Sequence, residues 1–134
     1  MKKVKLQLIG IALMLVVSAM ACNFSASTAK IKDAYLSTTE DGAAKTTSFA
    51  QDQPFYAIVT LSNAPDDTAV KAVWYAVDAE GADPNQKIDE VTLTGGDGTY
   101  PFSLKNDGPW PLGSYKVELW LNDKLDKTLE FTVE

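Results

Sequence analysis

The chain has few side chains suited to chemistry, and its single cysteine is the most informative. The 134 residues include no histidine and no arginine, and Cys22 carries the one thiol. This cysteine follows a start with three lysines, an apolar run from Leu6 to Val17 and the small residues Ser18 to Ala21. A basic start, a short apolar core and small residues before a cleavage position are typical of an export signal. We therefore expect the mature chain to begin at Cys22.

This arrangement resembles a bacterial lipoprotein signal, in which cleavage leaves the cysteine as the first residue and lipid is joined to its sulfur. The resemblance implies a signal peptide over 1–21, a lipidated tether over 22–29 and palmitate-type acyl chains that hold the protein at a membrane. The apolar run is shorter than the ~20 residues that a membrane-spanning helix needs. Ordinary secretion and an uncleaved anchor are the alternatives.

Composition limits the partners. Cleavage before Cys22 leaves 113 residues, enough for one domain, and nine lysines then face 18 acidic residues. The resulting formal charge of −9 repels phosphate backbones and anionic lipid headgroups. The sequence therefore argues against nucleic acid and against electrostatic membrane binding. We expect the protein on the extracytoplasmic side of the cell membrane or outer membrane, with the membrane as a partner through its lipid and an envelope protein or glycan as a second candidate.

From position 30 onward, β-type segments alternate with turns. Turn-forming residues gather at 40–42, 63–67, 81–85, 95–98 and 106–109. The segments between them predict strands over 30–38, 55–62, 70–77, 90–94, 100–105, 114–121 and 125–133. Seven short strands at this spacing favour an all-β fold, a two-layer antiparallel β-sandwich over 30–134.

The last two strands allow a register to be predicted, because apolar residues occupy the odd positions in both. Opposite residues of an antiparallel pair lie on one face. The predicted pairs are Tyr115 with Phe131, Lys116 with Glu130, Val117 with Leu129 and Leu121 with Leu125. The connection is then a three-residue loop or a two-residue turn with a bulge. Lys127 falls on the inward set and is expected to reach out at an edge.

The segment before Tyr115 resembles the tyrosine corner of immunoglobulin-like and fibronectin type III-like sandwiches, because a proline and a glycine precede a strand that opens with tyrosine. The runs Gly96–Tyr100, Gly113–Leu119 and Phe131–Val133 are similar to segments of exported bacterial Ig-like domains. The resemblance implies a seven-stranded Ig-like sandwich with Trp74 in its core. Such folds carry many unrelated activities.

The other two tryptophans are candidates for function. The predicted register turns Trp120 away from the core and places it opposite Asp126. If the third and sixth strands are neighbours, as in Ig-like sandwiches, then Val73, Tyr75 and Trp120 share an outer face. An aromatic patch of this kind would contact a protein or a sugar ring, although Trp120 could instead only cover a neighbouring strand. Trp110, between two prolines, is either a plug at the end of the sandwich or a further ligand contact.

Metal binding and catalysis find little support. Oxygen donors between Asp78 and Asn85 lack the EF-hand pattern, so solvated turn acids are the favoured interpretation. The lack of histidine excludes histidine triads and histidine–metal sites. Carboxylate pairs remain, but Asp89 and Glu90 are consecutive and would point to opposite faces of a strand. We expect no cofactor, no metal and no enzyme.

The sequence thus predicts a membrane-anchored cell-envelope lipoprotein whose Ig-like domain is a non-catalytic binding or structural module. A carbohydrate-binding domain that stacks sugars on Trp120, Tyr75 and Trp110 is the alternative. A small carboxylate enzyme is a third class.

Overall fold

The structure is a computed structural model that describes residues 28–134. The predicted signal peptide and most of the tether, with Cys22, lie outside these residues. Eight strands make up the described part: β1 (Lys30–Ser37), β2 (Ser48–Phe49), β3 (Phe55–Ser62), β4 (Ala69–Ala79), β5 (Gln86–Thr94), β6 (Gly98–Leu104), β7 (Gly113–Leu121) and β8 (Lys124–Val133). The all-β prediction is confirmed, and the predicted seven strands all occur, the one over 55–62 with the predicted bounds and the other six with shifted ends. The number of strands is corrected to eight by β2.

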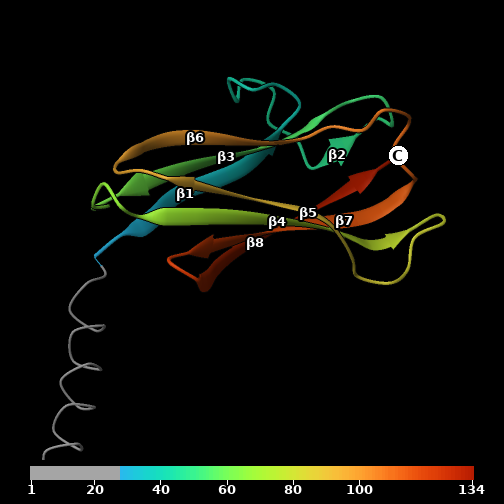
Figure 1. The fold of residues 1–134 in the computed structure, drawn as a ribbon. Helices are drawn as coiled ribbons and strands as arrows, with labels where there is room; N and C mark the ends of the chain where they lie inside the picture. Colours follow the sequence, from blue (N-terminus) through green and yellow to red (C-terminus); the bar gives the residue numbers. More distant parts are fainter. Residues whose placement is uncertain (1–27) are drawn as a thin grey trace, which may run out of the picture.

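Two sheets pack face to face (Figure 1). The smaller sheet has the order β1-β3-β6, and the larger one has the order β2-β8-β7-β4-β5. Neighbouring strands are antiparallel except for β2, which runs parallel to β8. The described chain begins at one end of the sandwich, and the C-terminus lies at the other (Figure 1).

Strand β2 is too short for alternation to predict, because two residues show no period. Its Phe49 is only 1% exposed and packs into the core. Backbone bonds hold the segment in place: the Thr132 amide donates to the Thr47 carbonyl, and the Glu134 amide donates to the Phe49 carbonyl. This strand covers the C-terminal part of β8 and leaves the rest of that edge unpaired.

The β7–β8 hairpin confirms three predicted pairs and corrects the fourth. The pairs Tyr115–Phe131, Lys116–Glu130 and Val117–Leu129 form as expected. A bulge after Leu119 then shifts the register, so Leu121 lies opposite Lys124 rather than Leu125, and Trp120 lies opposite Leu125 rather than Asp126. The two-residue turn is adopted: Asn122 and Asp123 both have positive φ, 47° and 65°, as a type I′ turn requires.

Lys127 behaves as the alternation predicts. It lies opposite the fully buried Leu119, yet Lys127 itself is exposed. The reason is that this stretch of β8 forms the edge of the sheet.

The core between the sheets is aromatic at its centre. Phe55 is fully buried, and its ring lies 4.4 Å from that of Trp110, 4.7 Å from that of Phe131 and 4.9 Å from that of Phe49, between ring centroids. Trp74, with no exposed surface, is a core residue as predicted. Stacked and edge-to-face pairs of this kind stabilise a fold beyond the burial of their area.

The tyrosine corner implied by the resemblance is present. The Tyr115 hydroxyl donates to the Pro111 carbonyl, 2.6 Å away and four residues upstream. Tyr100 repeats the arrangement at the start of β6, where its hydroxyl donates to the Gly96 carbonyl at 2.7 Å. Each tyrosine fastens a connection between the two sheets to the strand that follows it.

Candidate functional site

The outer face of β4 and β7 carries three of the four predicted surface residues. These strands are neighbours, as predicted, with Lys71 opposite Trp120, Val73 opposite Glu118 and Tyr75 opposite Lys116. Since opposite residues share a face, Val73, Tyr75 and Trp120 lie on the same side of the sheet. The core lies on the other side, where Trp74 and Val117 are opposite one another and fully buried.

Lysines cover both aromatic rings on this face. The Lys71 ammonium lies 5.0 Å from the centre of the Trp120 ring, and the Lys116 ammonium lies 4.9 Å from the centre of the Tyr75 ring. Both distances suit cation–π attraction.

Glu118 connects the two covered rings. Its carboxylate accepts a hydrogen bond from the Trp120 indole nitrogen at 3.3 Å and pairs with the Lys116 ammonium, also at 3.3 Å. Val73 lies beneath this network and is only 4% exposed. The face is therefore a connected polar and aromatic layer rather than a bare apolar patch.

Leu125 extends this layer, and sequence reasoning missed it. Among residues 28–134 it is the one large hydrophobic residue that is exposed, at 45%. It lies opposite Trp120 only because of the bulge after Leu119. The Asn122–Asp123 pair, whose residue types favour a two-residue turn, was the signal that could have revealed it.

Trp110, the fourth predicted residue, belongs to the core rather than to this face. It is 6% exposed, and its ring stacks on that of Phe55. Its indole nitrogen donates to the Gln53 carbonyl at 3.1 Å, and its backbone carbonyl accepts a bond from the Gln51 side chain at 2.9 Å. The position matches the plug interpretation. One edge of Trp110 reaches a hollow of about 230 Å³ that Ile88 and Tyr115 also line.

One pair of charged groups with shifted pKa values borders the outer face, because on β5 Lys87 lies opposite Tyr75 and Glu90 lies opposite Val73. Lys87 and Glu90 form an exposed pair on β5, in which their mutual hydrogen bond raises the pKa of the lysine and lowers the pKa of the glutamate. Burial raises the pKa of the Tyr115 hydroxyl. In the pair, the hydrogen bond favours the charged form of both groups, and in Tyr115 burial favours the protonated hydroxyl.

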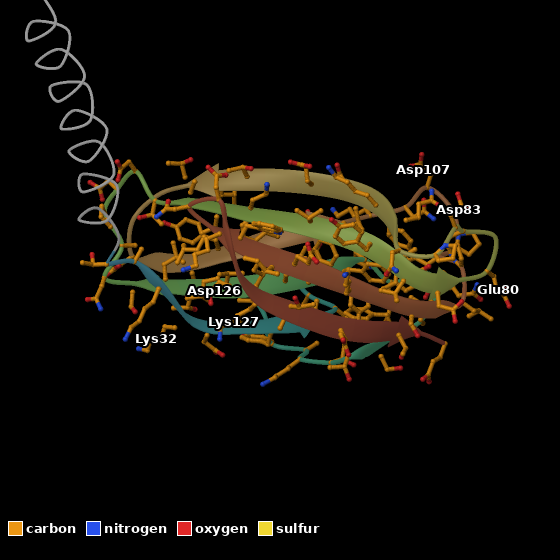
Figure 2. The ribbon with its side chains drawn as sticks, turned by 90° about the horizontal axis from the view of Figure 1, so that it is seen from below. Lys32, Glu80, Asp83, Asp107, Asp126 and Lys127 are labelled. Atoms are coloured by element: carbon orange, nitrogen blue, oxygen red, sulfur yellow. The ribbon has the colours of Figure 1, made fainter. Side chains whose placement is uncertain are left out.

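The acidic β4–β5 loop shows no metal arrangement. Glu80 and Asp83 project from the end of the sandwich opposite to the start of the described chain, as does Asp107 (Figure 2). Within residues 28–134, no three histidine, cysteine or acidic side chains gather closely enough to hold a metal ion. The same part of the chain has no helix with the length and apolar character needed to cross a membrane.

Comparison with known proteins supports the fold. No protein-family model matches the sequence, and no curated protein matches it by sequence. An immunoglobulin-like protein from Pseudomonas aeruginosa superposes with a TM-score of 0.56 at 16% identity, over 81% of this chain and 98% of that protein. An alkylpurine DNA glycosylase from Pseudomonas fluorescens, solved with DNA containing an abasic site analog, gives 0.52 at 14% identity over 81% of this chain and 31% of the glycosylase. At these identities the likeness establishes an Ig-like fold and nothing further.

Proposed function

We propose that the protein is a lipid-anchored component of the bacterial cell envelope, acylated on Cys22, whose Ig-like sandwich is a non-catalytic contact module. The observation that carries the proposal is the export signal that ends at the only cysteine of the chain. Attachment to a membrane gives this unpaired thiol a chemical role, because a free exported thiol would be open to oxidation. Acylation at two positions, on the sulfur and on the new amino terminus, suffices for stable anchoring.

The contact surface is the outer face of β4 and β7, with Tyr75 and Trp120, whereas the predicted contact residue Val73 is buried beneath them at 4% exposure. Trp120 is partly exposed, lies beside the exposed Leu125 and has an indole nitrogen that already bonds Glu118. A tryptophan at the edge of an ordered face is a common anchor for a partner. The lack of histidine and arginine supports a non-catalytic role, and the acidic charge supports a partner other than nucleic acid.

Carbohydrate binding, the alternative, receives less support from the geometry. Sugar stacking needs bare aromatic faces, whereas Lys71 lies over Trp120 and Lys116 lies over Tyr75. Trp110 is buried in the core and cannot serve as a platform without rearrangement. Binding on a glycan array that is lost in Trp120→Ala would restore this alternative.

The anchor is tested by flotation of cell membranes on a density gradient. We expect the wild-type chain to float with membranes and the Cys22→Ser variant to remain in the soluble fraction or unprocessed. Ser25→Ala, three residues further along, is the matched control and should float as the wild type does. An uncleaved Cys22→Ser precursor would float through its retained apolar run, so the size of the floating chain is measured as well. Equal flotation of wild type and a Cys22→Ser chain that has lost residues 1–21 would refute the lipid anchor.

The contact surface is tested by Trp120→Ala. Because Trp120 lies on the outer face, the free energy of unfolding should change by no more than about 1 kcal/mol, the scale of the cation–π contact that is lost. Retention of envelope components by the anchored protein, measured by cross-linking in intact cells, should fall. Unfolding of the variant would instead make Trp120 a structural residue.

A further inference from the structure

The end of the sandwich at which the described chain begins carries an exposed leucine, Leu125, beside the partly exposed Trp120. The β7–β8 turn lies at this end, and the hairpin places Trp120 opposite Leu125 on the outer face. Tryptophan prefers the boundary between water and hydrocarbon, where its ring is buried and its indole nitrogen keeps a polar partner. Here that partner is the Glu118 carboxylate, 3.3 Å away. An exposed leucine beside such a tryptophan is suited to insertion among lipid headgroups.

The chain leaves the fold beside this pair. Ala29 lines the same hollow, of about 280 Å³, as Leu121, Lys124 and Leu125. Thr28 is fixed by a hydrogen bond from its hydroxyl to the Asn63 carbonyl at 3.0 Å. The segment between Cys22 and Ala29 can span at most about 25 Å when fully extended. Lipid on Cys22 would thus hold Leu125 close to the bilayer at a high effective concentration, so a weak contact would suffice.

The charge near this exit is mixed, so the membrane contact depends on the apolar side chains, with lysines beside them. Five of the nine lysines after Cys22 stand in the first residues of β1, β4 and β8, at positions 30, 32, 71, 124 and 127. Figure 2 shows Lys32, Lys127 and Asp126 on this side of the sandwich. Lysine side chains next to an inserted tryptophan can reach lipid phosphates. Acidic side chains lie at the same end, at positions 33, 66, 67, 97, 123 and 126, and the Asp97 carboxylate accepts a bond from the Ala64 amide beside the Asn63 that holds Thr28.

We propose that Trp120 and Leu125 insert into the headgroup region of the bilayer, so that the Cys22 lipid and the β7–β8 hairpin hold the sandwich on the membrane at two points. This inference rests on the proposed lipid anchor. It assigns the lipid bilayer as the partner that Trp120 contacts. It directs the opposite end, with the β4–β5 loop and the connection from β6 to β7, away from the membrane.

Tryptophan fluorescence in proteoliposomes tests the inference. The lipidated full-length protein is reconstituted into phosphatidylcholine vesicles with a minor share of phosphatidylglycerol, with and without brominated acyl chains. Trp74 and Trp110 are buried at 0% and 6% exposure, so bromine-dependent quenching should report on Trp120. We expect loss of emission in brominated vesicles, no such loss in Trp120→Phe, and a smaller loss in Leu125→Ser.

Val77→Ser is the matched control, because it makes the same change of polarity in the part of β4 furthest from the anchor, and it should be quenched as the wild type is. Circular dichroism of each variant verifies the fold. Protein that floats with the vesicles but shows no quenching of Trp120 would overturn the two-point contact while leaving the lipid anchor intact. Protein that does not float at all would overturn the anchor and, with it, this inference.

Discussion

At the scale of single residues, Tyr115 and Trp110 each combine a buried ring with one polar atom that bonds a backbone carbonyl. Tyr115 is the clearest example: 2% of the residue is exposed, its ring stacks on Phe131 at 5.5 Å between centroids, and its hydroxyl reaches the Pro111 carbonyl. The ring stabilises the core, whereas the hydroxyl fixes the connection that leads into β7. These two contributions can be separated by removing the oxygen alone.

We expect Tyr115→Phe to lower the free energy of unfolding by about 1 kcal/mol at neutral pH, the net value of one hydrogen bond. The variant should also respond less to alkali. Burial raises the pKa of Tyr115 above its ordinary value of 10.0, so the folded state keeps the proton to a higher pH than the unfolded state does. The stabilisation is complete below the unfolded pKa and is lost as pH rises through the folded pKa.

Phenylalanine has no proton to lose, so the difference between wild type and Tyr115→Phe should shrink above about pH 10. Urea unfolding at several pH values measures this difference in the free energy of unfolding. Parallel stability curves for the two proteins would show that the hydroxyl does not titrate with folding.

At the scale of elements, the β7–β8 turn determines which residues share the outer face. Asn122 and Asp123 both have positive φ, and Asn122 also bonds the neighbouring strand β4. Its side-chain oxygen accepts a bond from the Ala69 amide at 2.9 Å, and its own amide donates to the Ala69 carbonyl at 2.8 Å. The turn is therefore fixed to the start of β4, and the bulge after Leu119 follows from a turn of this length.

Glycine substitutions at the two turn positions should have opposite effects. Asp123→Gly relieves a left-handed backbone conformation and should raise the free energy of unfolding by roughly 0.5 kcal/mol. Asn122→Gly relieves the same conformation but loses the side-chain bond to Ala69, so it should lower the free energy of unfolding by about 1 kcal/mol. Thermal or urea unfolding of the pair distinguishes the roles, and changes of equal sign would contradict them.

Gly113 is required by the close approach of β7 to β4. Its φ is +148°, and an added Cβ would lie 2.6 Å from the Ala79 Cα and collide with the Asp78 carbonyl oxygen. We expect Gly113→Ala to cost about 2–4 kcal/mol of stability, because backbone must move. Gly108→Ala is the matched control, since nothing lies within 4 Å of its Cβ, and it should be nearly neutral. Equal unfolding midpoints for the two variants would refute this requirement.

Local patterns in the sequence predict most of this architecture. Alternation sets the pairs from Tyr115 to Val117 because one face of both strands is buried, and a slip by one residue would expose it. Alternation cannot find the bulge after Leu119, because turn geometry and the contact of Asn122 with Ala69 select it. For the same reason the sequence pairs Trp120 with Asp126 and misses Leu125.

Other features depend on contacts between distant segments. Strand β2 exists because Phe49 enters the aromatic core and the backbone reaches β8. Trp110 becomes buried because the chain folds its ring onto Phe55, 55 residues earlier in the chain. Lys71 and Lys116 cover rings on the neighbouring strand, which no local pattern shows.

At the scale of the whole molecule, the two ends of the sandwich differ. One end receives the chain from Cys22 and holds the β7–β8 hairpin, whereas the other carries Glu80, Asp83 and Asp107 (Figure 2). The acidic side chains at that end disfavour association with anionic surfaces, and a short tether would keep the domain close to the proposed lipid on Cys22. The proposed lipid on Cys22 therefore determines which surfaces meet the membrane and which meet the surroundings.

Intact mass spectrometry of the protein isolated from its own membranes tests this account most directly. We predict a polypeptide that begins at Cys22 and carries the added mass of a diacylglyceryl group and an amide-linked acyl chain, and Cys22→Ser should lack both the cleavage and the lipid. An unmodified chain of 134 residues that begins at Met1 and retains a free thiol would contradict the account.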